Sequence, residues 1–261
     1  MSTSPQQPVS TKQQQPVSTA PETKWNPDIY NDYKSIREKP FYDMLNFIKP
    51  PCSATGTELS TFSLIDMGCG TGELTNDVSS RFPSATIVGS DSSAEMLSKQ
   101  PKTLSPNVTL VQRTIEDELD FTVAQEKFDI VISNAAMQWV GDHAKLFPLL
   151  LQKVKKPSDY TDVSGDGAVK SAYGQLAVQM PCQADNVLNQ ILRSIVQQEP
   201  FRSVLRDFTI ASPVLSMDQY ATILFQNGVK GDNITVSQQI YPIIGQNAED
   251  LYHFIEGSAV R

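Results

Sequence analysis

The chain has 261 residues, a formal net charge of −8 and 39% hydrophobic residues, and its isoelectric point is about 4.8. This acidic balance argues against nucleic acid or an anionic membrane as the main partner, because both attract clustered Lys and Arg. Three scattered cysteines and two histidines provide neither a disulfide framework nor the ligand spacing of a zinc site. We therefore expect a cytosolic monomer with one α/β domain, a small-molecule substrate and no bound metal.

Residues 1–24 are mainly Ser, Thr, Pro, Gln and Val, a composition that buries too little apolar area to offset the entropy of ordering. We predict a disordered tail here, unlike a signal peptide or a mitochondrial leader. The folded domain is expected over residues 25–261. Trp25 and Tyr30 begin a predicted helix that extends to residue 37, and a second helix is predicted over residues 40–48. These helices either cover the binding site as a lid or simply pack on the sheet.

The most informative stretch joins a predicted strand at 62–66 to a predicted helix at 73–82. Here Gly68, Gly70 and Gly72 follow Asp66 at every second position. Glycine permits positive φ and close approach of a ligand, and a helix start at this point places free amide donors beside that ligand. Asp66 would repel a pyrophosphate but would hold a cation such as an ammonium group. The stretch predicts a ligand-binding turn, with a glycine-rich turn that binds nothing as the alternative.

A second predicted strand, at residues 85–91, ends in Asp91. In open α/β sheets a carboxylate about twenty residues after the glycine turn accepts hydrogen bonds from ribose hydroxyls. Ser92 and the residues after it open a helix with a Ser cap and an acidic first turn. Asp91 is therefore either a ribose ligand or only the cap of that helix.

The rest of the chain alternates between strand and helix patterns, as expected of a parallel sheet. Further strands are predicted at 107–111, 128–133, 175–180 and 233–240, and further helices at 142–155, 186–198, 217–227 and 247–256. The fourth strand ends at Asn134, and the residues up to Trp139 lie at the carboxyl edge of the sheet, where such folds bind ligands. In the helix at 142–155, core packing is expected from the stripe Leu146, Leu149, Leu150 and Val154.

Several motifs together resemble the trans-aconitate methyltransferases, a family of class I S-adenosylmethionine-dependent methyltransferases. They are Trp25-Asn26-Pro27 with Tyr30, the loop from Asp66 to Gly72, Asp91-Ser92-Ser93 with Met96, Asn134-Ala135 with Gln138-Trp139, and residues 176–181. The resemblance spans residues 25–261. It implies S-adenosylmethionine as the cofactor and a Rossmann-like class I methyltransferase fold, which is a mostly parallel, doubly wound sheet with a helical N-terminal lid and a helical insertion after strand 5.

The resemblance also implies which residues touch the cofactor. The methionine part is bordered by Asp66, Gly68, Gly70 and Gly72, the ribose is bound by Asp91 with Ser92, and the sulfonium side is lined by Asn134. The family's acid after the third strand aligns with Thr114, so Glu116 or backbone groups are expected to hold the adenine amine. Two further departures are an insertion at 156–173 and the lack of the family's final antiparallel strand, which is expected beyond Arg261.

The implied reaction converts one carboxylate of trans-aconitate into a monomethyl ester. A carboxyl group in water has a pKa of about 4, so it is ionised at neutral pH and needs no general base. A polycarboxylate does need cations, which Arg supplies best. The expected substrate contacts are Tyr30, Arg37, Trp139, His143 and Arg261, with Arg193, Arg202 and Arg206 as further candidate cations.

Other functions remain open at this point. Residues 135–137 lack the Pro-Pro-aromatic motif typical of enzymes that methylate the amino groups of nucleic-acid bases, which argues against that substrate. The alternatives are a methyltransferase for another small acid or a lipid-like substrate, and a catalytically inactive protein that binds the cofactor or a partner.

Overall fold

The computed structural model describes residues 34–52, 58–160, 174–182, 186–206 and 212–242, with the backbone alone for residues 34–37. Residues Ser35–Pro242 form one compact unit. Several expectations fall outside the described residues: the tail at 1–24, Trp25, Tyr30, most of the insertion, the helix at 247–256 and Arg261. They remain predictions.

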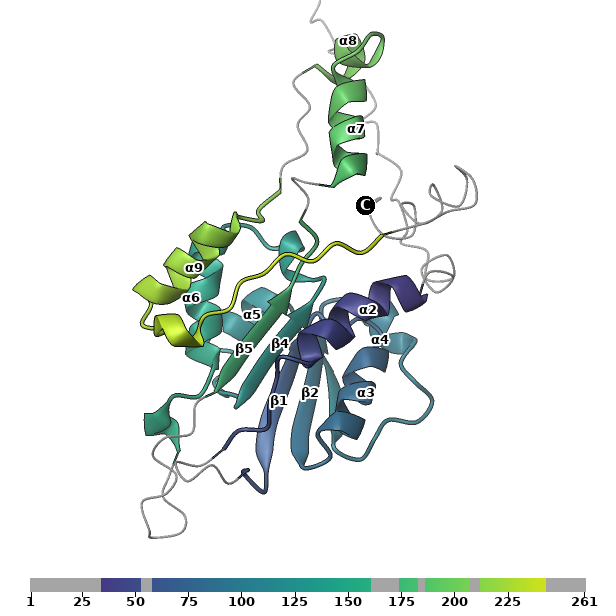
Figure 1. The fold of residues 1–261 in the computed structure, drawn as a ribbon. Helices are drawn as coiled ribbons and strands as arrows, with labels where there is room; N and C mark the ends of the chain where they lie inside the picture. Colours follow the sequence, from purple (N-terminus) through teal and green to yellow (C-terminus); the bar gives the residue numbers. More distant parts are fainter. Residues whose placement is uncertain (1–33, 53–57, 161–173, 183–185, 207–211, 243–261) are drawn as a thin grey trace, which may run out of the picture. The chain divides into compact units, whose positions relative to one another are not determined.

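The fold is organised around a five-stranded sheet in which every neighbouring pair is parallel. The strands are β1 (Phe62–Met67), β2 (Ala85–Asp91), β3 (Val108–Gln112), β4 (Ile130–Asn134) and β5 (Gln175–Gln179), in the order β3-β2-β1-β4-β5 (Figure 1). This confirms the predicted parallel sheet. Because the strand order reverses between β1 and β4, the carboxyl ends of these two strands form the switch point at which open α/β sheets bind ligands.

Helices cover both faces of the sheet. On one face α2 (Lys34–Leu45) and α3 (Glu73–Arg81) contribute to an apolar core with β1 to β4. On the other face α5 (Ile115–Leu119), α6 (His143–Lys153) and α9 (Met217–Gln226) contribute to a second core. The remaining helices are α4 (Ala94–Ser98), α7 (Val187–Val196) and α8 (Phe201–Leu205). The central strands are apolar along their length because both of their faces are covered.

The N-terminal part of the fold differs from the prediction, which placed one helix up to residue 37 and a second over residues 40–48. A single helix, α2, runs from Lys34 to Leu45 with Pro40 inside it. Proline removes one helical hydrogen bond. Phe41, Met44 and Leu45, on the turns after Pro40, are all buried in the core, and their burial offsets that loss.

Two other predictions are wrong. Leu149 in α6 is 37% exposed, whereas Leu146 and Leu150 are buried, so the core stripe of this helix is narrower than expected. Residues 234–240 form no strand, and only the short 3₁₀ turn Gly231–Asn233 precedes them. Val236 of this segment packs against the second core, whereas Ile240 is 88% exposed.

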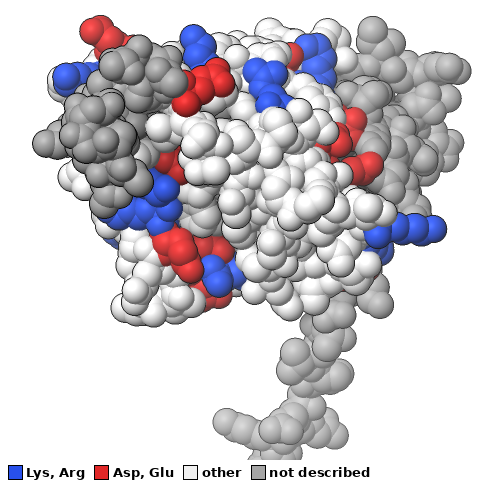
Figure 2. Space-filling view, turned by 90° about the horizontal axis from the view of Figure 1, so that it is seen from below, with Lys and Arg blue, Asp and Glu red and all other residues white. Residues whose placement is uncertain are grey.

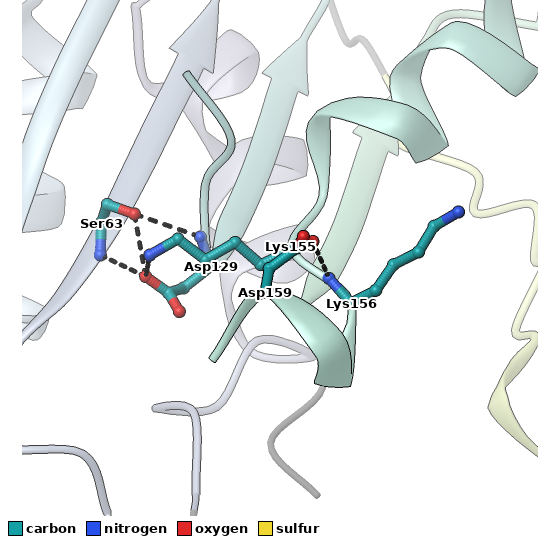
Figure 3. Close-up of polar contacts among 5 residues, drawn as sticks. All are labelled: Ser63, Asp129, Lys155, Lys156 and Asp159. Carbon is teal, nitrogen blue, oxygen red and sulfur yellow. Dashed lines mark hydrogen bonds and ion pairs between the residues drawn. The ribbon is translucent and has the colours of Figure 1, made fainter. Parts of the chain in front are cut away.

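A buried polar cluster fixes the amino edge of the sheet (Figure 3). Asp129, just before β4, accepts hydrogen bonds at Oδ2 from the backbone N and the Oγ of Ser63 at 2.7 and 2.8 Å, and it pairs there with Lys155 Nζ at 2.8 Å. Its backbone O accepts from Gln175 N at 2.8 Å. Burial raises the pKa of Asp129, but the Lys155 ammonium and the Ser63 donors outweigh it and hold the pKa below its ordinary value. Asp129 thus ties the start of β4 to β1 and to Lys155 through its carboxylate, and to β5 through its backbone carbonyl.

The surface seen in Figure 2 is largely uncharged, with Lys, Arg, Asp and Glu side chains interspersed over it. Among the described residues on this face, neither sign of charge forms an extended patch. In the part of the chain that the structure describes, no helix is both long and apolar enough to cross a bilayer.

Candidate functional site

The glycine loop between β1 and α3 adopts the backbone that its sequence requires. Gly68, Gly70 and Gly72 have φ angles of +78°, +61° and +75°, values that favour glycine because it lacks a Cβ. Space around the loop is equally restrictive. A Cβ on Gly68 would lie 2.2 Å from Ala136 Cβ, and one on Gly72 would lie 2.4 Å from Leu110 Cδ1. The loop therefore packs closely against both the turn after β4 and strand β3.

The glycine amides are not the free donors expected from the sequence. Gly68 N donates to Ser90 O at 2.8 Å, Gly70 N to Asp91 Oδ2 at 2.8 Å, and Gly72 N to Cys69 O at 3.0 Å. The first two bonds hold the loop against the carboxyl end of β2, and the third closes a turn within the loop. The glycines thus provide shape and close approach, and the charge of the site comes from side chains.

Asp66 provides a buried negative group beneath the loop. Its side chain is 3% exposed, and its Oδ2 accepts a hydrogen bond from Thr75 Oγ1 at 2.6 Å. Burial raises the pKa of Asp66 to about 6, while the Thr75 bond lowers it and the charge of Asp91 raises it further. The site therefore contains two neighbouring acidic side chains, which favour a cationic ligand.

Asp91 lies at the carboxyl end of β2, and it is not the N-cap of the next helix, which was the alternative to a ribose ligand. Its Oδ2 accepts from Gly70 N and its Oδ1 accepts from Ser93 N, both at 2.8 Å. The N-cap of α4 is Ser93, whose side chain accepts from Met96 N. The carboxylate joins the glycine loop to α4 and still has lone pairs for a ligand hydroxyl. Ser92 beside it is exposed.

Asn134 is the last residue of β4, the strand that borders the switch point on the side opposite β1. Its Oδ1 is buried, and no hydrogen-bond partner for it is found in the part of the molecule that the structure describes. Buried polar atoms are rarely left unpaired in native proteins, so this oxygen is a candidate ligand contact. The next residue, Ala135, has φ +52°, an uncommon backbone for a residue with a Cβ.

His143 is placed differently from the substrate contact expected from the sequence. Its side chain is 1% exposed, Nδ1 lies 2.5 Å from Tyr220 Oη, and Nε2 lies 2.9 Å from Met137 O. Both ring nitrogens are used inside the protein, so the ring is not available to bind substrate. Sequence reasoning missed Tyr220 because it is 77 residues away from His143.

The adenine side of the site departs from the expected pattern. Thr114 is the N-cap of α5, and its Oγ1 accepts from Asp117 N at 3.0 Å. Glu116 is exposed and lines a cavity of about 370 Å³ between α5 and α6, together with Leu119, Asp120 and Leu146 among others. The expected role of Glu116 at an adenine amine remains a prediction.

The other predicted substrate residues are only partly described. Trp139, in the 3₁₀ turn Met137–Trp139, is 44% exposed. Arg37 lies in α2, where only its backbone is described. The candidate cations Arg193, Arg202 and Arg206 are exposed. The described residues contain no group of three or more His, Cys, Asp or Glu side chains placed to hold a metal ion.

These features fit S-adenosylmethionine. A cationic sulfonium and ammonium suit the carboxylates of Asp66 and Asp91, close approach suits a glycine-rich loop, and Asn134 Oδ1, which has no partner among the described residues, offers an acceptor. Sequence reasoning missed Thr75, although a hydroxyl three residues after Gly72 was the available signal for a partner of Asp66.

A doubly wound parallel sheet with this acid, glycine loop and second carboxylate at its switch point defines a class I S-adenosylmethionine-dependent methyltransferase. A family model described as a methyltransferase domain matches residues 64–156. The trans-aconitate 2-methyltransferase of Deinococcus radiodurans is 32% identical over 242 residues, which cover 90% of this chain and 81% of that protein. The chain belongs to the trans-aconitate 2-methyltransferase family.

Of two further comparisons, one agrees with the family and the other with the fold. The trans-aconitate 2-methyltransferase of Mycobacterium tuberculosis strain H37Ra is 27% identical over 238 residues, covering 90% of this chain and 78% of that one. A solved complex of the Haloferax volcanii Trm112 methyltransferase activator with a methyltransferase matches 81% of this chain and 77% of that chain, with 13% identity and a TM-score of 0.50. The second comparison concerns the fold alone.

Proposed function

We propose that this methyltransferase transfers a methyl group from S-adenosylmethionine to one carboxylate of a small polycarboxylate, with trans-aconitate as the first candidate. The products are a monomethyl ester and S-adenosylhomocysteine. The observation that supports this substrate most directly is the 32% identity with the Deinococcus radiodurans protein named for it.

The proposed cofactor contacts follow the switch point. Asp66 and the three glycines border the methionine part, Asp91 and Ser92 bind the ribose, and Asn134 lines the sulfonium side. When bound, the cofactor supplies an electrophilic methyl group. The chain supplies the negative charge of Asp66 and Asp91 around that cation, and the Gly70 bond keeps the Asp91 carboxylate at the edge of the loop.

The proposed reaction needs no general base, because the acceptor carboxylate is already ionised at neutral pH. This agrees with a His143 ring that is fully engaged in the core. The chain then contributes alignment of the carboxylate oxygen with the methyl group and exclusion of water, effects that together supply several kcal/mol. Arg37, Arg261, Tyr30 and Trp139 are the proposed contacts to the acceptor.

The cofactor site is tested by calorimetric titration of S-adenosylmethionine into the wild type and into Asp91→Ala. Loss of charge-assisted hydrogen bonds from ribose hydroxyls should weaken binding by about 10- to 100-fold. Asp232→Ala removes an exposed acid in a surface turn and is the matched control. Unchanged affinity in Asp91→Ala, with a wild-type melting temperature, would contradict the proposed ribose contact.

The acceptor is tested by incubating the protein with S-adenosylmethionine and a panel of di- and tricarboxylates, with methyl esters detected by mass spectrometry. We expect monoester formation from trans-aconitate to exceed that from the other acids. Turnover of a different acid would redirect the substrate assignment. Cofactor binding without any turnover would support an interaction protein instead.

A further inference from the structure

His143 forms the centre of a fully satisfied hydrogen-bond chain. Its Nε2 faces Met137 O at 2.9 Å, and because a carbonyl only accepts, Nε2 must carry the ring proton. In the neutral ring Nδ1 is then an acceptor, and Tyr220 Oη donates to it at 2.5 Å. The Tyr220 oxygen in turn accepts from Leu215 N at 3.0 Å. Burial raises the pKa of Tyr220, which keeps the hydroxyl protonated as this chain requires.

The carbonyl that receives the His143 proton belongs to the turn beside the cofactor loop. This turn comprises residues 135–139. Its Ala135 O accepts from Gln138 Nε2 at 2.7 Å, and its Ala135 N donates to Gln179 O at 3.0 Å. The methyl group of Ala136 occupies the space where a side chain on Gly68 would lie. A shift of the turn would therefore change its packing against the glycine loop.

The turn needs support from outside itself. Ala135 has φ +52°, a left-handed backbone that is unfavourable for a residue with a Cβ. Met137 is completely buried, and its carbonyl accepts from Val140 N at 3.0 Å as well as from His143. Of these two bonds, only the one from His143 comes from a side chain, and Tyr220 of α9 fixes the orientation of that side chain.

We propose that His143 is a positioning residue that holds the turn at 135–139 against the glycine loop, with Tyr220 setting the tautomer of its ring. Through this bond, a helix near the end of the described chain supports the cofactor side of the switch point. The role concerns binding of S-adenosylmethionine and is independent of the proposed acceptor.

Core packing alone is the competing explanation for a buried histidine, and the surroundings allow it. The His143 ring lies 5.8 Å from the Phe147 ring, which lies 4.7 Å from the Tyr220 ring. Packing would be preserved by any ring of similar size, whereas positioning requires a donor at the place of Nε2. Variants that separate these two properties decide between the explanations.

The first experiment measures the dissociation constant and the stoichiometry of S-adenosylmethionine by calorimetry. His143→Phe keeps a ring but removes both hydrogen bonds, and we expect about tenfold weaker binding, the effect of one lost hydrogen bond. His143→Gln keeps an N–H at a reach similar to that of Nε2 and should remain within about threefold of the wild type. The dissociation constant of Tyr220→Phe should lie between those of the two His143 variants, because the bond from His143 to Met137 O remains but Tyr220 no longer orients the ring.

Phe147→Leu is the control for packing, since it disturbs the same ring cluster without removing a hydrogen bond. It should lower the melting temperature without changing the dissociation constant. A purely structural role for His143 would likewise reduce stability or the fraction of active protein at constant affinity. If His143→Phe behaves in this way, or if His143→Gln binds as weakly as His143→Phe, the proposal is wrong.

A second readout needs neither turnover nor cofactor. The chain has two tryptophans, so Trp25→Phe leaves Trp139, at the end of the turn, as the only one. In this background, His143→Phe should change the emission maximum and the acrylamide quenching of Trp139, while Phe147→Leu should not. Where His143→Phe is poorly folded, the comparison of Tyr220→Phe with His143→Gln gives the same test. Absence of methyl-ester formation in the wild type would refute the proposed substrate and leave these readings unaffected.

Discussion

Among single residues, Asp66 shows how a binding site and stability oppose each other. Its carboxylate is buried beside a second carboxylate, with Thr75 as its hydrogen-bond donor. The native state therefore holds a negative charge that burial disfavours. The bound cofactor is a cation, so the charge that weakens the free protein strengthens the complex.

We predict that Asp66→Asn stabilises the free protein and weakens cofactor binding. The folded pKa is raised from 3.8 to about 6, so this group's contribution to stability is present below about pH 4 and is lost as the pH rises through 6. Removal of the charge should raise the free energy of unfolding at pH 8 by roughly 1–3 kcal/mol, with no gain at pH 4. Urea unfolding at both pH values measures the difference.

Thr75→Val is the matched comparison for Asp66→Asn. It removes the hydroxyl that donates to Asp66 but keeps the charge, so it should destabilise the protein at pH 8 by about 1–3 kcal/mol. Equal destabilisation by both variants at pH 8 would show that the Asp66 charge carries no net cost in the native state.

At the level of structural elements, the glycine loop and the turn after β4 form one packed unit. We predict that Gly68→Ala costs about 2–4 kcal/mol of unfolding free energy, because it adds backbone strain to a clash with Ala136. Gly70 also has a positive φ, but the Cβ added in Gly70→Ala would contact only the end of the Met96 side chain, with Cε 3.0 Å away. It should cost about 1 kcal/mol. Denaturant unfolding of the two variants, with calorimetry of cofactor binding, provides the test, and equal costs would contradict the packing argument.

The cluster that joins β1, β4 and β5 gives a different prediction. Asp129→Asn should cost about 3–5 kcal/mol at pH 7, because it leaves the Lys155 ammonium without its partner. The pKa of Asp129 is lowered, so its stabilisation is present above the unfolded-state value of about 4 and is lost as the pH falls below it. The deficit of the variant should therefore shrink in acid, which thermal melts between about pH 3 and 7 can follow.

Lys127→Gln is the control for this cluster. It breaks the more exposed ion pair between Lys127 and Asp159 at 3.0 Å and leaves Asp129 untouched. Such pairs contribute about 0–1 kcal/mol. A loss as large as that of Asp129→Asn would mean that burial does not distinguish the two pairs.

At the scale of the whole molecule, features encoded by neighbouring residues were predictable and distant contacts were not. Strand β2 has the predicted bounds, and Asp66, the glycines and Asp91 fall within one strand-helix-strand unit. The His143 contact with Tyr220 spans 77 positions, and no local pattern encodes it. The predicted strand at 233–240 is wrong for a related reason, because an alternating apolar pattern does not show whether a partner strand lies beside it.

The two ends of the sheet have separate tasks. Asp129, Ser63 and Lys155 tie the amino ends of the strands together, while Asp66, Asp91 and Asn134 line the carboxyl ends around the switch point. Random mutagenesis with paired selections for cellular abundance and for methylation should therefore sort substitutions by sheet edge. Substitutions at the amino edge should lower the cellular abundance of the enzyme, and substitutions at the carboxyl edge should lower the methylation activity of each molecule. Stabilising substitutions at the amino edge should therefore allow destabilising substitutions at the carboxyl edge that change specificity.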